Sequence, residues 1–269
     1  MAEDLIIAAK NGDLDMVQFF IRGGVHVNST GTHGYTALIM AAHYRRIEIV
    51  NFLIAAGCNV NAAESSNYTA LMLAAATGNV EIVKSLIRAG ASLNNVDGSG
   101  FTALSLASAN GNLETVQILI TAGANIHAVD HCGNTAVIVA GNLDVTKCLI
   151  EAGVNIHTPN NIGYNALIKA SYFGRYDIVK YLVRSGANIY AVNRFGDTPR
   201  FFAAKYCYHN TNRFLLHVEM TDIIIALSPL ELSPYVLLWI LQWTTQFQDH
   251  EQLWVLRLIE GIQRSRRKN

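Results

Sequence analysis

The sequence predicts an all-α protein in which short pairs of helices stack as a solenoid, followed by one further pair of helices. Two repeated positions support this prediction. The residue expected to open the first helix of each unit recurs at intervals of 33, 33, 33, 30 and 33 residues, at Thr36, Thr69, Thr102, Thr135, Asn165 and Thr198. The glycine expected to close the second helix recurs at the same intervals, at Gly24, Gly57, Gly90, Gly123, Gly153 and Gly186. Because two independent positions share one period, we expect about six to seven stacked copies of one unit.

The copy at residues 67–99 shows how one unit is expected to fold. Thr69 is placed to cap a first helix of small apolar residues, and Gly78 ends that helix. Asn79 can cap a second helix, which carries its apolar residues on one face and which Gly90 closes. Residues 94–99 then have the composition of a hairpin-like turn. One such unit cannot bury both of its helices alone, so it needs a copy on each side.

The repeated pattern, Gly-x-Thr-Ala-Leu-x-x-Ala-Ala-x-x-Gly-Asn-x-Glu-x-Val-x-x-Leu-Ile-x-x-Gly-Ala, resembles the ankyrin repeat over roughly residues 1–200. The resemblance implies helix-turn-helix units joined by hairpin-like turns, with a concave groove that faces partners. Of the family's Thr-Pro-Leu-His tetrapeptide, only Thr198 and Pro199 keep the proline, and the histidine is absent throughout. Because that histidine would hydrogen-bond between repeats, stacking is expected to depend more on apolar contact.

These observations divide the chain into segments with stated boundaries. We expect an N-terminal capping repeat at 1–33, ankyrin repeats at 34–66, 67–99, 100–132 and 163–195, a shortened ankyrin repeat at 133–162, a degenerate ankyrin repeat with an insertion at 196–228, and a C-terminal segment at 229–269.

Two of these repeats depart from the pattern. The repeat at 133–162 lacks three residues after Ala140, close to one turn at the end of its first helix, so the stack should kink or leave a notch there. This deletion is either neutral drift in a tolerant repeat or a shaped pocket for a partner. In the repeat at 196–228, residues 205–216 are expected to form an insertion that lengthens the first helix or its loop.

Composition excludes several function classes. Lysine plus arginine equals aspartate plus glutamate, at 20 each, so the overall charge indicates neither nucleic acid nor an acidic membrane surface as a partner. The four cysteines lack the spacing of a metal site or a disulfide framework, which favours free thiols in a reducing compartment. The first residues are too polar, and their apolar run is too short, for us to expect a signal peptide, and no apolar run approaches the ~18 residues of a membrane span.

Motifs for catalysis, cofactors and metals are not found. The sequence contains no Walker motif, no zinc-ligand spacing and no Gly-x-Ser-x-Gly. His127 and His157 occupy the repeat position held elsewhere by Asn28, Asn61 and Asn94, so they are interpreted as repeat-position substitutions rather than metal ligands. We therefore expect no catalytic residues, no metal and no cofactor.

Aromatic residues recur at positions that the resemblance places toward the concave groove. They are Tyr35, Tyr68, Phe101 and Tyr164 between the repeated glycine and threonine, and His43, Tyr44, Tyr172 and Phe173 at the ends of first helices. The fold does not need rings at these positions, and aromatic residues often dominate binding energy. They are the candidate partner-binding residues; the alternative is that the rings only pack on the neighbouring hairpin.

The segment at 229–269 is predicted to form two helices. Its first part resembles the opening helix of F-box motifs, which follow ankyrin repeats in poxvirus-type ankyrin proteins, through Leu232, Pro234, Val236, Leu237, Ile240 and Leu241. This resemblance implies docking to a cullin-ligase adaptor, and a SOCS-box-like tail is a further alternative. The competing interpretation is a helical cap that covers the last repeat.

The sequence as a whole predicts a non-enzymatic interaction module, a monomer that holds a protein partner in its groove. The alternative is a substrate-recognition adaptor of a cullin-type ubiquitin ligase. Neither nucleic acid nor a membrane is expected as a partner, and the expected location is cytoplasmic or nuclear.

Overall fold

A computed structural model describes residues 1–227 of the chain. The chain divides into two compact units, Met1–Thr211 and Asn212–Asn269, and the first unit contains the repeats that form the candidate site. The predicted helical pair at 229–269 and the candidate tail residues Leu232, Pro234, Val236, Leu237, Ile240 and Leu241 lie outside the described residues.

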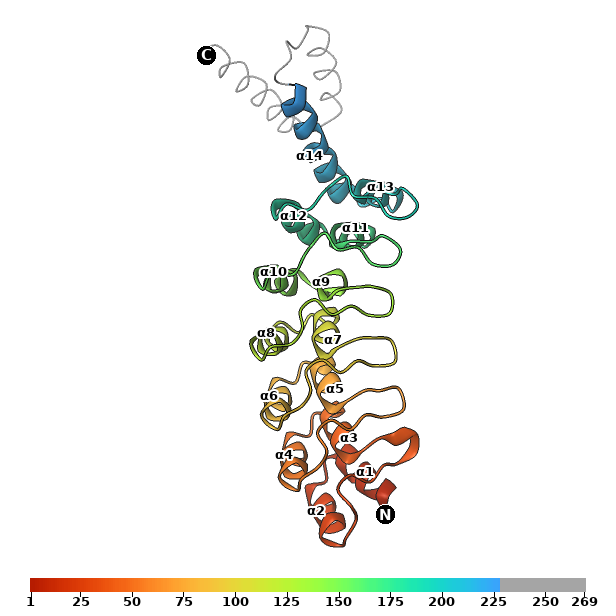
Figure 1. Cartoon of the computed structure of the whole chain (residues 1–269), viewed down its shortest axis with the longest axis vertical. Coiled ribbons are helices and arrows are strands. Elements are labelled where there is room, and N and C mark those ends of the chain that lie inside the picture. The colour runs from red at the N-terminus through yellow and green to blue at the C-terminus, as the bar shows by residue number, and fades with distance from the viewer. Residues whose placement is uncertain (228–269) are drawn as a thin grey trace. The chain divides into compact units, whose positions relative to one another are not determined.

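The first unit is built from alternating helices, as the sequence predicts. The first helix of each repeat forms one column in Figure 1, and these helices are α1 (Ala2–Asn11), α3 (Ala37–His43), α5 (Ala70–Thr77), α7 (Ala103–Ala109), α9 (Ala136–Val139), α11 (Ala166–Tyr172) and α13 (Pro199–Lys205). The second helices form the column beside it, and they are α2 (Leu14–Arg22), α4 (Ile47–Ala55), α6 (Val80–Arg88), α8 (Leu113–Thr121), α10 (Leu143–Glu151) and α12 (Tyr176–Arg184). The last helix of the described chain is α14 (His209–Leu227).

Hairpin-like loops connect each repeat to the next and project on the side of the first helices in Figure 1. The loop before α3 contains a short 3-10 helix, η1 (Thr32–Gly34). Isolated bridges close three of the loops, between Thr30 and Thr36, Ala63 and Thr69, and Val129 and Thr135. Within residues 1–227 the regular structure is otherwise helical, which confirms the predicted all-α solenoid.

Capping residues set where most first helices begin. The Thr69 side chain accepts a hydrogen bond from the Met72 N–H at 3.3 Å, which satisfies one of the donors that a helix start leaves open. Thr36, Thr102, Asn165 and Thr198 cap their helices in the same way. Thr135 does not, because its buried Oγ1 has no partner among the described residues.

The core runs continuously between the two columns of helices. From α4 to α12, each second helix fully buries two apolar residues in its middle, for example Val83 and Leu86 in α6. In the neighbouring first helix, Leu71 and Met72 are about as deeply buried, at 1% exposure each. Each of α5, α7 and α9 packs on the first helix of the following repeat, so the apolar surface that one unit exposes is covered by the next.

Helix α9 is shorter than the other first helices, with four residues against seven to ten. The chain turns directly after it, and the Gly141 N–H donates to the Ser108 carbonyl of α7 at 2.8 Å. The Arg175 guanidinium, from the following repeat, donates to the Ala140 carbonyl. Backbone contact on one side and an arginine on the other therefore replace the contacts of the missing turn.

The expected insertion at residues 205–216 requires a correction. Helix α13 has seven residues, the same length as α11, and α14 begins at His209, 33 residues after Tyr176 opens α12. The first helix and its loop are therefore of ordinary length. The extra length lies in the second helix, since α14 has 19 residues where α12 has nine. The sequence comparison failed here because the residues of α14 lack the apolar pattern of the other second helices.

In the part of the chain that the structure describes, no helix combines the length and hydropathy needed to span a membrane.

Candidate binding groove

Consecutive hairpins are joined to one another by single backbone hydrogen bonds. The Ser65 N–H donates to the His33 carbonyl at 2.9 Å, and the Gly98 N–H donates to the Ser66 carbonyl at 2.8 Å. Equivalent bonds join the later hairpins, from His131 to Ser99, from Asn161 to Cys132 and from Arg194 to Ile162. The hairpins of the first unit therefore form one continuous wall of the groove.

Each hairpin is closed by one buried side chain that accepts two backbone N–H groups. In the hairpin before α5, Glu64 accepts from Ser66 and Tyr68 at 2.9 and 3.0 Å. The equivalent residues in later repeats are Asp97, Asp130, Asn160 and Asn193, each at most 9% exposed. A carboxylate oxygen and an amide oxygen can thus close the hairpin equally well, because each can accept two hydrogen bonds from backbone N–H groups of the turn.

The first hairpin of the stack, which precedes α3, has glycine at this position and obtains its carboxylate from elsewhere. Glu3 of α1 accepts a hydrogen bond from the Thr32 N–H at 3.2 Å. A Cβ at Gly31 would lie 2.3 Å from a carboxylate oxygen of Glu3, so the side chain of Glu3 occupies the place of the missing hairpin residue.

The floor of the groove is a row of residues at the fourth position of each first helix. In chain order these residues are Met40, Leu73, Leu106, Val139, Lys169 and Phe202. The first four are half-buried and apolar, which leaves an apolar strip open to the groove. Lys169 interrupts the apolar row in the repeat at 163–195.

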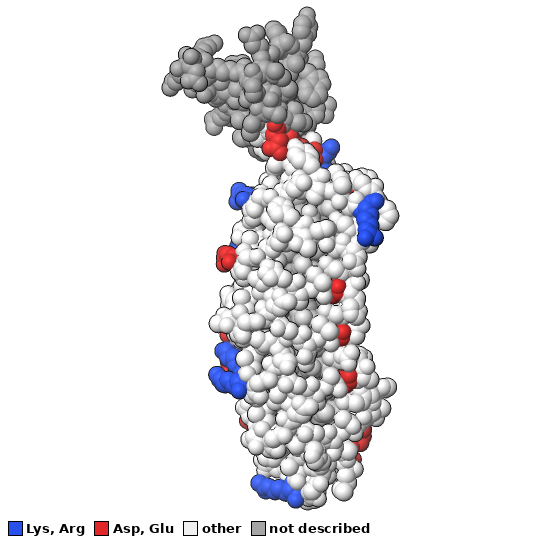
Figure 2. Space-filling view, in the orientation of Figure 1, with Lys and Arg blue, Asp and Glu red and all other residues white. Residues whose placement is uncertain are grey.

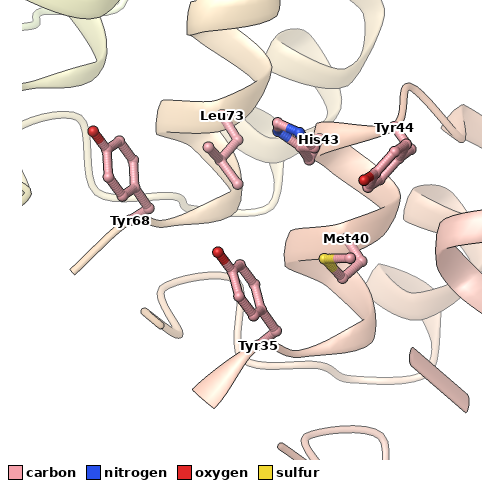
Figure 3. A pocket seen from close by; sticks show the side chains of 6 residues that line it. All are labelled: Tyr35, Met40, His43, Tyr44, Tyr68 and Leu73. Atoms are coloured by element: carbon pink, nitrogen blue, oxygen red, sulfur yellow. The ribbon is translucent and has the colours of Figure 1, made fainter. Parts of the chain in front are cut away.

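A pocket of about 300 Å³ opens at the N-terminal end of the groove (Figure 3). We call it the tyrosine pocket, and its lining residues are Tyr35, Met40, His43, Tyr44, Tyr68 and Leu73. Figure 3 shows the rings of Tyr35 and Tyr68 on neighbouring hairpins, beside Met40 of α3 and Leu73 of α5. His43 and Tyr44, at the end of α3, form an edge-to-face pair with ring centroids 4.9 Å apart. The Lys10 ammonium lies 5.3 Å from the centre of the Tyr44 ring.

Tyr68 is coupled to the carboxylate of the next hairpin. A side-chain hydrogen bond with Asp97, reinforced by burial, raises the pKa of Tyr68 above its ordinary value. Asp97 Oδ1 accepts the N–H groups of Ser99 and Phe101, at 2.8 and 2.9 Å. Oδ2 is buried with no partner within 3.5 Å among the described residues, so the Tyr68 contact is longer or less well aligned than the two backbone bonds. A carboxylate oxygen of Asp97 thus remains incompletely satisfied beside the Tyr68 ring.

A second aromatic group lies in the last repeats of the first unit. We call it the aromatic cluster, and its members are Tyr164, Tyr172, Phe173, Phe202 and Tyr206. The Tyr172 ring is central, with centroids 5.1 Å from Phe173, 5.4 Å from Phe202 and 5.1 Å from Tyr206. Such edge-to-face contacts stabilise by about 0.5–1.5 kcal/mol each beyond their buried area.

Two lysines lie over rings of the aromatic cluster. The Lys169 ammonium is 5.1 Å from the centre of the Phe173 ring and 5.9 Å from that of Tyr164. The Lys205 ammonium is 5.7 Å from the centre of Tyr206. The surface of this cluster is therefore aromatic and cationic.

The structure brings most of the candidate residues into these two groups. Tyr35, His43, Tyr44 and Tyr68 line the tyrosine pocket, and Tyr164, Tyr172 and Phe173 belong to the aromatic cluster. Phe101 is half-buried on a hairpin between the two and lines neither. The ring of Tyr164 also meets Phe202 from the next repeat, at 5.5 Å. The rings thus contact neighbouring repeats, as the packing interpretation expects, and remain partly exposed; their role in binding a partner stays a prediction.

Sequence reasoning missed the floor of the groove and the hairpin acceptors. Both sets recur with the same 33-residue period as the capping threonines, so alignment of the repeats on one another contains the signal that would find them. Tyr206 was missed because it lies in the expected insertion at 205–216, and Phe202 was missed because the other repeats have no aromatic residue at its position.

No group of three or more histidine, cysteine, aspartate or glutamate residues within the described part of the chain is arranged to hold a metal ion. All four cysteines are free thiols.

The fold and the groove define a helical-repeat protein of the class that presents one continuous concave surface. A family model described as ankyrin repeats in three copies matches residues 5–97, 57–130, 104–193 and 134–225. The chain belongs to the ankyrin-repeat family. A search of curated proteins found no match. Ankyrin repeats generally mediate protein–protein interaction and are typically not enzymes.

Proposed function

We propose that this chain is a non-enzymatic scaffold that holds a protein partner in the groove formed by its hairpins and first helices. The observation that carries the proposal is the placement of partly exposed aromatic residues along that groove, in the tyrosine pocket and in the aromatic cluster. Rigid aromatic side chains contribute large contact area at low entropic cost, and they are enriched among residues that dominate binding energy. The aromatic residues Tyr35, His43, Tyr44, Tyr68, Phe101, Tyr164, Tyr172 and Phe173 are the proposed partner-binding set.

The experiment begins with identification of a partner by proximity labelling of the full-length chain. Affinity is then compared between the wild-type protein and the double variant Tyr68→Ala plus Phe101→Ala. The double variant should bind more weakly by over ~1 kcal/mol, because it removes two rings of the groove. Phe19→Ala is the matched control, since Phe19 lies on the second helix α2 and is 66% exposed. Unchanged affinity in the double variant, with its unfolding midpoint preserved, would exclude the groove as the binding surface.

A second candidate function rests on the resemblance of Leu232, Pro234, Val236, Leu237, Ile240 and Leu241 to an F-box motif. In this function the groove selects a target and the tail recruits a cullin-type ubiquitin ligase. Pull-downs with the full chain and with a chain lacking residues 229–269 distinguish the two functions. Recovery of adaptor and cullin only with the tail present supports the ligase role. Absence of both from the full-length sample, together with insolubility of the shortened chain, supports a cap.

We further propose that the chain acts as a monomer in the cytoplasm or nucleus. Four free thiols support a reducing compartment. Sedimentation of the purified chain and imaging of the tagged protein test these two points.

A further inference from the structure

The charged residues of the groove are segregated along its length. Its groove-facing segments run from the start of each hairpin to the end of the following first helix. In the first four of these segments, residues 30–44, 63–77, 96–110 and 129–140, the charged residues are Glu64, Asp97 and Asp130, with no lysine or arginine. In the last two, residues 159–173 and 192–206, they are Lys169, Arg194, Asp197, Arg200 and Lys205. The first four segments, which we call the acidic part, therefore have a formal charge of −3. The last two segments have four positive residues and one negative residue, which gives a formal charge of +3.

Figure 2 shows the same separation on one face of the molecule. Acidic atoms recur in a column on the side where the hairpins project, and basic atoms lie on that side at the level of α13. Helix α1, which precedes the first hairpin, adds Glu3, Asp4 and Lys10 and so does not reverse the sign at that end.

The three carboxylates of the acidic part have no cationic partner among the described residues. Glu64, Asp97 and Asp130 are 5%, 3% and 7% exposed, and their hydrogen bonds come from backbone N–H groups and uncharged side chains. Charges lining a groove with low-dielectric walls focus their field into it and attract ions of the opposite sign. The Tyr68 phenol lies in that field, since Glu64 and Asp97 both act to raise its pKa. Asp97 Oδ2, buried beside this ring and incompletely satisfied, adds to the negative field at the Tyr68 side of the pocket.

The hairpin acceptor also changes chemistry where the charge changes sign. The carboxylates of the acidic part give way to Asn160 and Asn193, which close their hairpins with the same pair of backbone bonds. In the same repeats Lys169 enters the otherwise apolar floor and Lys205 lies over the aromatic cluster. Each end of the groove therefore combines aromatic rings with charge, which is negative around the tyrosine pocket and positive around the aromatic cluster.

We propose that the groove takes an extended peptide segment of a partner protein that is basic at one end and acidic at the other. A lysine or arginine side chain enters the tyrosine pocket, where the aromatic faces attract a cation and where the field of Glu64 and Asp97 acts on Tyr68. The acidic end lies against Lys169 and Lys205 at the aromatic cluster. This inference rests on the proposed function, because it specifies the chemistry of the segment that the groove holds.

The length of the segment follows from the stack. Three steps between packed first helices, α5 to α7, α7 to α9 and α9 to α11, separate Tyr68 from Tyr164. Packed helices lie about 8–10 Å apart, so three steps span about 24–30 Å. An extended chain advances about 3.3 Å per residue, so about eight residues connect the two charged ends.

The probe is a displayed library of random twelve-residue peptides, selected on the immobilised full-length protein at about 50 mM salt. We expect recovered sequences with lysine or arginine near one end and aspartate or glutamate about eight residues away. A synthetic copy of a recovered peptide should bind about tenfold more weakly in about 0.5 M salt, because the attraction is electrostatic.

The variant Asp97→Asn plus Asp130→Asn tests the acidic part without removing the hairpin bonds. Asn160 and Asn193 show that an amide closes the same turn in this chain, so the variant should remain folded. It should bind the recovered peptide about tenfold or more weakly and should lose part of the salt dependence, since Lys169 and Lys205 still attract the acidic end of the peptide. Lys169→Glu plus Lys205→Glu, selected in the same way, should recover peptides whose formerly acidic end is basic.

The outcomes separate this inference from the function on which it rests. One outcome would overturn the bipolar segment and leave the groove as the binding surface. In it, the recovered peptides carry no charge at either end and bind the asparagine variant as well as wild type, but they do not bind Tyr68→Ala plus Phe101→Ala. Peptides unaffected by Tyr68→Ala plus Phe101→Ala would overturn both, and so would a selection that enriches none.

Discussion

Replacement of Gly141 by alanine should destabilise the repeat stack, because no space exists for a side chain at the shortened repeat. A Cβ at Gly141 would lie 2.5 Å from the Ala109 carbonyl oxygen, whereas ordinary contact begins near 3.4 Å. The backbone must therefore move by several tenths of an ångström, which costs about 1–3 kcal/mol in well-packed sites. The same movement weakens the bond from the Gly141 N–H to the Ser108 carbonyl, at about 1 kcal/mol. The expected loss is about 2–4 kcal/mol.

The assay is urea unfolding followed by far-ultraviolet circular dichroism. With a denaturant dependence of about 3 kcal/mol per molar, the midpoint should fall by roughly 0.7–1.3 M. Gly98→Ala is the matched control, since neither glycine has a left-handed backbone and the nearest atom to a Cβ at Gly98 is the Ser66 carbonyl oxygen, at 3.4 Å. Both substitutions restrict the unfolded chain equally, so that effect cancels in the comparison.

Repeat arrays can unfold in segments, so the two variants are compared by their midpoints rather than by absolute free energies. A midpoint for Gly141→Ala that equals or exceeds that of Gly98→Ala would refute the reasoning, because it would mean that the shortened repeat accepts a side chain without strain.

Three further predictions concern the joints between repeats and the buried polar groups. Asn94→Ala should destabilise the folded protein by about 1 kcal/mol, because the Asn94 side chain accepts a hydrogen bond from the Asn125 N–H of the next repeat at 2.8 Å. His127→Ala, at the same repeat position, is the control and should change the unfolding midpoint little. Equal shifts of the midpoint in the two variants would contradict this prediction. Thr69→Val should lose a cap and cost about 1 kcal/mol, whereas Thr135→Val, which removes a buried hydroxyl without a partner, should leave thermal stability equal or higher. Burial raises the pKa of Cys58 from 9.0 to about 11, so its thiol should react with a disulfide reagent at pH 8 more slowly than the exposed Cys132 and Cys207. Because the folded-state pKa of Cys58 lies above the unfolded one, its contribution to stability is present below pH 9 and is lost as the pH rises through 11. If Cys58, Cys132 and Cys207 react with the disulfide reagent at equal rates in single-cysteine variants, the raised pKa of Cys58 is wrong.

The period of the sequence predicted the stack because the residues that set it act locally. A capping threonine and a glycine with a left-handed backbone, such as Thr69 and Gly78, determine where a helix begins and ends regardless of distant contacts. The expected dependence of stacking on apolar contact was incomplete. Asn28, Asn61 and Asn94 each accept a backbone N–H from the following repeat, at 2.7, 2.7 and 2.8 Å. These bonds join residues 31 apart, which a search for local motifs does not detect.

The candidate site was harder to predict, because it depends on which side chains of different repeats meet. The sequence identified Tyr35 and Tyr68 by their spacing, but the contact of Tyr68 with the next hairpin's Asp97 requires the geometry of the stack. Phe202 has no aromatic counterpart in the other repeats, so its contacts with Tyr164 and Tyr172 could not be read from the period.

The buried acceptor of each hairpin separates the charge of the groove from the stability of the fold. Glu64, Asp97, Asp130, Asn160 and Asn193 hold their turns through the same pair of backbone bonds, whether or not they carry a charge. A single substitution between aspartate and asparagine can therefore reset the electrostatic preference of one repeat while its turn stays closed. In such a stack the charge along the groove can therefore change repeat by repeat without loss of the backbone bonds that close the turns.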